Sequence, residues 1–88
     1  MKADQTNDAE ALALGALGWA LAEGRRAQRL VALTGLTPAG MRESLEDRPF
    51  LAAVLRFLEG HEPDLIGCAD ALGVAPASLV RAREELER

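Results

Sequence analysis

The sequence has very little of the two residue types that most often build disulfides and metal sites. Its 88 residues include one cysteine, Cys68, and one histidine, His61. A single cysteine cannot form an internal disulfide, which is typical of a protein in a reducing cytoplasm. A metal site draws on several converging ligands, usually with more than one histidine or cysteine among them. We therefore expect no disulfide and no metal, and we predict that Cys68 is a small buried apolar residue.

Catalytic signatures are also missing. The only serines, Ser44 and Ser78, lie outside any G-x-S-x-G turn, and His61 has no evident nucleophile to activate. Gly15 and Gly18 of "GALG" fall inside a predicted helix, whereas phosphate-binding glycines lie in a loop between a strand and a helix. The sequence therefore predicts neither an enzyme nor a bound cofactor.

No apolar run is long enough to predict a membrane span. The longest, residues 11–22, has twelve residues. A helix that crosses a bilayer needs roughly 20. The preceding "KADQTNDAE" is polar and acidic, unlike the positively charged start of a secretory signal. These features predict a cytoplasmic protein that makes no membrane contact.

Alanine and leucine are abundant, with seventeen and fifteen residues respectively. Both favour helix over sheet, and no stretch alternates apolar and polar residues as a half-buried strand would. We predict an all-α fold, a compact orthogonal bundle of five to six short helices. We expect residues 1–7 to form a mobile tail and residues 8–88 to form a single domain. The predicted helices span residues 8–23, 25–34, 38–46, 47–60, 63–73 and 76–88.

Capping residues mark several of these bounds. Asn7, with Glu10 three residues later, is typical of a capping box at the start of the first helix. Gly35 is a helix stop, and Thr37 followed by Pro38 is a helix start.

Apolar spacing predicts which side chains face the core. Leu30 and Leu33 are expected to point inward from the second helix, and Met41 and Leu45 from the third. The helices at 8–23 and 47–60 are apolar around most of their circumference. We therefore expect these two helices to pack together at the centre.

The first helix carries a face of small residues, Ala11, Gly15, Gly18 and Ala22. Each glycine inside a helix costs roughly 1 kcal/mol relative to alanine, so close approach of another helix should offset that cost. Packing within the same chain is the favoured interpretation, because other helices can supply the partner. A homodimer through this helix is the alternative to a monomer.

The stretch "CADALGVAPASLVRAREEL", residues 68–86, resembles a DNA-binding helix-turn-helix. Ala69 lies four residues before Gly73 in the predicted turn, and Leu79 lies six residues after it. In the second helix of the pair, Leu79, Ala82 and Leu86 share an inward stripe. In the 64–88 helix pair, Ser78 and Arg81 are then the only candidates for contacts with bases or phosphates.

The charge of this region argues against DNA. Residues 1–58 carry seven acidic and seven basic side chains, whereas residues 59–88 carry seven acids and three arginines, a local charge of −4. Binding to nucleic acid draws much of its affinity from neutralised phosphates, which this charge opposes. A corner that only completes the core is therefore the favoured interpretation, with DNA binding as the alternative.

The segment "GRRAQR" places Arg25, Arg26 and Arg29 on one side of the second helix. Cations near a helix N-terminus oppose its dipole, so helix stability does not explain them. A docking patch for an acidic partner is one interpretation. A solvated face, paired with Glu23 or with the acids of the 63–73 helix, is the favoured one.

Three segments together resemble a family of short bacterial proteins, chiefly alphaproteobacterial, whose function is unknown (family 3572). They are "EALALGALGWALAE", "LVALTGLTPAGMRESLEDRPFLAAVLRFLEGHEPDL" and "ALGVAP". The resemblance covers about residues 8–86. The family often has a proline after the acidic end of the first helix, where this chain has Gly24 and Arg25. The resemblance implies an all-helical cytosolic protein and transfers no catalytic or binding residue.

From the sequence we expect a small helical protein-interaction module with an unidentified protein partner. Its candidate surfaces are the arginine patch and any exposed part of the first helix. The alternative is a helix-turn-helix regulator that uses Ser78 and Arg81. A gel shift at low salt separates the two hypotheses.

Overall fold

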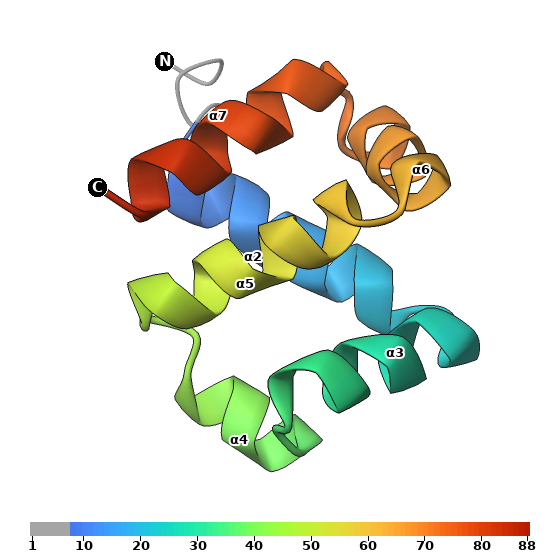
Figure 1. Cartoon of the computed structure of the whole chain (residues 1–88), viewed down its shortest axis with the longest axis vertical. Coiled ribbons are helices and arrows are strands. Elements are labelled where there is room, and N and C mark those ends of the chain that lie inside the picture. Colours follow the sequence, from blue (N-terminus) through green and yellow to red (C-terminus); the bar gives the residue numbers. More distant parts are fainter. Residues whose placement is uncertain (1–7) are drawn as a thin grey trace.

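The computed structural model describes residues 8–88, and within them every regular element is a helix (Figure 1). The all-α prediction is confirmed. The predicted mobile tail at residues 1–7 lies outside the described residues. The helices are α2 (Ala9–Leu21), α3 (Gly24–Thr34), α4 (Pro38–Glu43), α5 (Arg48–Glu59), α6 (Glu62–Leu72) and α7 (Pro76–Leu86).

Local capping explains where the helices begin. Asp8, one residue after the predicted cap, accepts hydrogen bonds from the backbone N–H groups of Glu10 at 2.8 Å and Ala11 at 3.4 Å. The Oγ1 of Thr37 accepts from the N–H of Gly40 at 3.0 Å, which confirms the predicted cap of α4. These oxygens satisfy N–H groups that have no partner within the helix.

Glycine explains where two of the helices end. Gly35 after α3 and Gly73 after α6 have φ angles of 73° and 72°. This left-handed conformation is costly for residues with a Cβ, so glycine allows the chain to turn away sharply. The third predicted helix ends earlier than expected, at Glu43, because the chain turns over residues 44–46.

The core lies where α2, α5 and α7 meet, and each of these helices packs on the other two. The prediction that the helices at 8–23 and 47–60 pack together is confirmed, with α7 as a third central element. In Figure 1, α5 and α7 lie in front of α2. The buried residues of α5 are Phe50, Leu51, Ala52, Val54, Leu55, Phe57 and Leu58. The predicted inward stripe of α7, Leu79, Ala82 and Leu86, is also buried.

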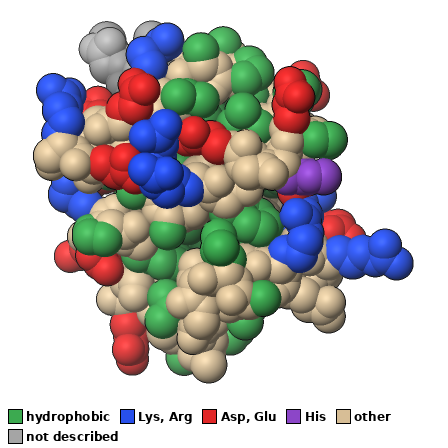
Figure 2. Space-filling model, viewed as in Figure 1, with side chains coloured by type: hydrophobic (Ala, Val, Ile, Leu, Met, Phe, Trp, Pro, Cys, Tyr) green, Lys and Arg blue, Asp and Glu red, His purple; other side chains and the backbone are tan. Residues whose placement is uncertain are grey.

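The corner formed by α3 and α4 adds much less to the core. Leu30 is the one buried residue of α3, and Met41 is the one buried residue of α4. The prediction that Leu33 points inward is wrong, because 60% of its surface is exposed. Leu45 was also expected inward and is exposed, since it lies in the turn after α4. Figure 2 shows mostly apolar and uncharged surface over this corner.

Candidate functional site

Arg26 of the predicted arginine patch is engaged by the end of α2. Its guanidinium carbon lies 3.7 Å from the centroid of the Trp19 ring, and its Nη2 donates to the Trp19 carbonyl at 2.9 Å. The carboxylate of Glu23 accepts from the backbone N–H of Arg26 at 2.9 Å, and this hydrogen bond lowers the pKa of Glu23. Arg26 therefore fixes the junction between α2 and α3.

Arg29 is engaged by α6. Its Nη2 lies 2.6 Å from a carboxylate oxygen of Asp64, and its guanidinium carbon lies 5.2 Å from the centroid of the Phe57 ring. The ion pair matches the favoured interpretation, which paired the patch with acids of the 63–73 helix. Arg25 is exposed and its side chain has no ion pair within residues 8–88, whereas Arg26, also without an ion pair, is held by Trp19. The structure therefore does not bring the three arginines together as a free docking patch.

The C-terminal helix pair has the geometry of a helix-turn-helix. The axes of α6 and α7 meet at 98°, and Gly73 makes the turn. The N–H of Val74 donates to the carbonyl of Ala69 at 3.0 Å, and the Ala69 side chain is buried beneath the turn. A corner of this angle is typical of the DNA-binding helix-turn-helix.

The outer face of α7 carries acidic as well as basic side chains. Ser78 and Arg81 lie together, with the Nη2 of Arg81 3.4 Å from the Ser78 hydroxyl. Glu84 and Glu85 are exposed on the following turn of α7. The corner packs on α2 and α5 instead of projecting from the bundle. It completes the core, as the favoured interpretation predicted.

The outward face of α2, defined as Ala11, Leu14, Gly18 and Leu21 together with the cap residue Ala22, is exposed. The prediction that other helices of this chain cover its small residues is wrong. Of the two glycines in the predicted small face, only Gly15 has a close neighbour, since a Cβ there would lie 3.1 Å from a methyl carbon of Leu72. The covered side of α2 is the opposite one, with Ala13, Ala16 and Ala20. Small residues occur on both sides of α2, so their spacing did not identify the buried one.

A groove between α5 and α7 was not predicted from the sequence. It has a volume of about 520 Å³, and Arg48, Arg56 and Arg88 stand around it. The spacing of Arg48, Ala52 and Arg56 at i, i+4, i+8 places them on one face of α5, which is a signal in the sequence. The position of Arg88 beside that face depends on how α7 packs.

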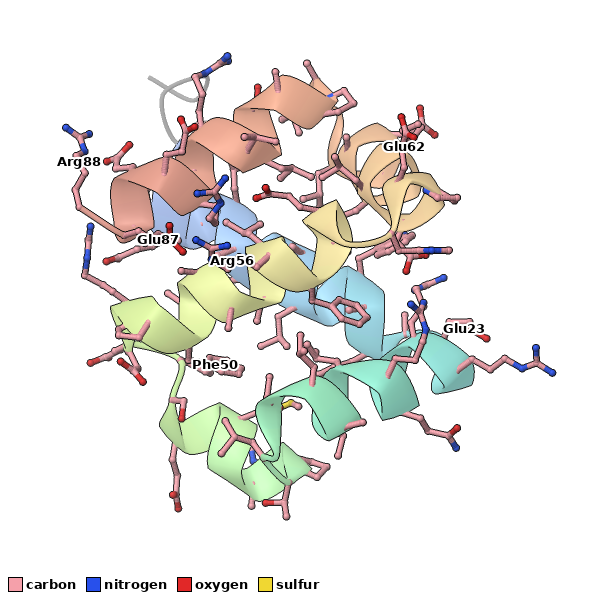
Figure 3. All side chains as sticks on the ribbon, viewed as in Figure 1. Glu23, Phe50, Arg56, Glu62, Glu87 and Arg88 are labelled. Atoms are coloured by element: carbon pink, nitrogen blue, oxygen red, sulfur yellow. The ribbon has the colours of Figure 1, made fainter. Side chains whose placement is uncertain are left out.

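Ion pairs connect the two helices at this groove. Glu87 accepts from Arg56 through both carboxylate oxygens and from Arg83 at 3.1 Å, and Arg83 also donates to Glu59 at 2.8 Å. In Figure 3, Arg56 and Glu87 face one another from α5 and α7. The hydrogen bonds from Arg56 and Arg83 lower the pKa of Glu87, while Glu59 and Glu87 raise the pKa of Arg83.

The remaining titratable candidates form no site in the described part of the chain. Cys68 is fully buried as predicted, and burial raises the pKa of its thiol to about 11. The thiol is therefore neutral and a poor nucleophile at neutral pH. His61 is exposed just before α6, and residues 8–88 contain no cluster of ligands that could hold a metal ion.

None of the described helices is by itself long and apolar enough to cross a membrane. Only α6 and α7 taken together reach the required length and composition, and they are bent by 98°.

No curated protein and no solved structure matches the chain. One family does, over residues 6–88, and its description is "Protein of unknown function (DUF3572)". The match extends over all six helices and both sides of the α5–α7 groove. The chain therefore belongs to this family of unknown function.

Proposed function

We propose that the chain is a protein-interaction module without catalytic activity, and that a second copy of the chain occupies the outward face of α2. One observation carries this proposal. Leu14 is 41% exposed and Leu21 is 40% exposed in a helix that is apolar almost throughout. Apolar surface gathered on one helix face is typical of a contact surface.

Gly18 supports the same surface. A Cβ added there would meet no atom within 4 Å, so nothing in the described chain requires a glycine. Glycine inside a helix costs about 1 kcal/mol relative to alanine. A helix from outside the chain that approaches the backbone at Gly18 accounts for the residue.

The face is self-complementary in an antiparallel pair. If a twofold axis passes beside residue 16, Leu14 of one copy packs against Gly18 of the other, and Ala11 lies near Leu21. Each contact occurs twice, as in any twofold interface.

Sedimentation equilibrium of the full chain tests the pair. We expect the wild type to dimerise as its concentration rises into the millimolar range, and L14E to stay monomeric with an unchanged circular dichroism spectrum. The matched control is L33E, which places the same charge on an exposed leucine of α3 and should still dimerise. A wild type that is monomeric throughout, or an L14E variant that dimerises normally, contradicts the choice of a second copy.

A second variant separates folding from association. We expect G18A to raise the free energy of unfolding of the monomer by about 0.5–1 kcal/mol, because alanine favours helix and has open space here. The same methyl group should weaken the dimer by holding the two helices apart. A variant that is more stable but dimerises as well as the wild type would contradict the role of Gly18.

Binding to DNA through Ser78 and Arg81 is the second candidate, and the 98° angle of the α6–α7 corner is the observation in its favour. We rank it lower because Glu84 and Glu85 follow on the same helix. A gel shift at low salt, weakened by R81A and by added salt, would support it. No shift at low salt would remove it.

We propose a cytoplasmic location for the module, supported by the single thiol of Cys68, which is buried and unpaired with another cysteine.

A further inference from the structure

The groove between α5 and α7 combines positive walls with an apolar floor. Arg48 and Arg56 line the groove from α5, and Arg88 lines it from just beyond the end of α7. Ala52, Ala53 and Leu86 line the groove between them. In Figure 3, Arg88 extends from the end of α7, on the same side of the molecule as Arg56 and Glu87.

The charge of the groove is opposite to that of the whole chain. The net charge of the protein is −4, whereas the charged side chains among those that line the groove are three arginines and one glutamate, a sum of +2. The glutamate is Glu87, and both of its oxygens already accept hydrogen bonds from arginine. It therefore has little capacity left to neutralise the other guanidinium groups.

The arginines keep donors available for a ligand. A guanidinium has five N–H donors, and Arg56 uses only its Nε and Nη2 on Glu87. Arg48 donates from Nη2 to the Glu85 carbonyl at 2.9 Å, and its Nη1 lies 3.6 Å from Glu10. The side chain of Arg88 makes no hydrogen bond or ion pair with residues 8–88. The groove can therefore receive carboxylates without breaking its own contacts.

The spacing of the arginines sets the spacing of those carboxylates. Residues 48 and 56 are eight positions apart on one helix face, which is about 12 Å along the axis at ~1.5 Å per residue. In an extended peptide, side chains at i, i+2 and i+4 share one side, and i and i+4 are about 13 Å apart. Two acidic residues at i and i+4 match the arginines, and an apolar residue at i+2 then lies over the alanines.

We propose that this groove binds an extended acidic segment of a partner protein, with the pattern acidic, any, apolar, any, acidic. The carboxylates pair with the arginines at the two ends of the groove, and the apolar side chain packs on Ala52 and Ala53. This site is separate from the outward face of α2, because α5 and α7 cover the opposite side of that helix. It does not depend on dimer formation.

The probe is the peptide acetyl-Glu-Ala-Leu-Ala-Glu-amide, and its neutral control replaces both glutamates with glutamine. We expect the acidic peptide to shift the backbone amide signals of residues 52, 53 and 86 in a nuclear magnetic resonance titration. The neutral peptide should bind more weakly, by up to about 25-fold, because it loses two charge pairs that are each worth up to about fivefold. Added salt should weaken the acidic peptide only.

Variants locate the contact. Arg88 lines the same groove and its side chain has no partner within residues 8–88, so it is free to reinforce the carboxylate contacts made by Arg48 and Arg56. We expect R88Q to weaken the acidic peptide by up to about threefold. The control R81Q removes the same charge from an exposed position of α7 outside the groove, so binding should change little. Three results would each overturn the proposal. The first is equal binding of the two peptides, the second is an equal effect of R88Q and R81Q on binding, and the third is no shift of the amide signals at millimolar peptide. The L14E variant should bind the peptide normally, so failure of the dimer and failure of the groove are distinguishable.

Discussion

The helices α5 and α3 have similar lengths, twelve and eleven residues, but very different surroundings. Seven residues of α5 are buried, because α2, α3, α6 and α7 all pack on it. One residue of α3 is buried, and α3 packs mainly on α2 and α5 at the edge of the bundle. The hydrophobic effect scales with the area removed from water, so the central helices supply most of the stability.

The α3–α4 corner relies more on polar and backbone contacts. Arg26 joins it to the end of α2, Arg29 joins it to α6, and Gly35 shapes its turn. Such contacts define geometry but each adds only modest net stability. We therefore expect the centre to unfold only with the whole protein, whereas the corner opens locally.

The largest effect is expected at the centre. L55A removes a fully buried side chain and should lower the free energy of unfolding by about 3–5 kcal/mol, measured by urea denaturation. L33A removes the same atoms from an exposed site of α3 and should cost about 0.5 kcal/mol or less. If the two variants lose similar stability, the contrast between centre and corner is wrong.

A smaller effect is expected in the corner. Met41 is the buried residue of α4, and M41A should cost about 2 kcal/mol, because α4 packs only weakly on the other helices and can shift to fill the space of the lost side chain. Hydrogen exchange should speed up in α3 and α4 and stay slow in α5. Equal acceleration in α5 would show that the corner and the centre open together.

The ion pair between α3 and α6 should contribute still less to the free energy of unfolding. D64N removes the charge paired with Arg29 and should cost about 1 kcal/mol, since the Asp64 side chain is 12% exposed and that of Arg29 is 46% exposed. A double-mutant cycle with R29Q measures the coupling directly. If the losses of unfolding free energy in D64N and R29Q simply add in the double variant, the ion pair does not stabilise the α3–α4 corner.

Acid should weaken the α5–α7 connection slightly. The pKa of Glu87 in the folded protein is below its ordinary value of 4.5, so the contribution of this carboxylate is complete above that pH. It is lost as the pH falls through the folded pKa, because the unfolded chain binds the proton first. We expect the Tm of the wild type to fall more steeply below pH 4.5 than that of E87Q. Parallel pH profiles would contradict this role of Glu87.

The helix bounds were largely predictable, because capping is a local interaction. Thr37 and Gly35 act within a few residues of their positions in the sequence, so the pattern was sufficient. The start of α2 was predicted one residue too early, since Asp8 is as good a cap as Asn7. Neighbouring capping residues compete, and the sequence does not rank them.

The candidate surfaces were predicted less well. The spacing of small residues on α2 did not show which side is covered, and the order of "GRRAQR" did not show that Arg26 lies on Trp19. The groove was missed because Arg48 and Arg88 are forty residues apart in the sequence. These features depend on contacts between helices, which local pattern does not specify.

By itself, the sequence determined an all-α chain and the position of each helix, because helix propensity and capping act over a few residues. It also determined that Leu79, Ala82 and Leu86 face the core, since one apolar stripe dominates α7. Only the tertiary structure decided which side of the nearly uniform α2 is covered and which arginines share a groove. Those outcomes follow from how the helices pack against one another, and side chains far apart in the chain meet only after that packing is complete.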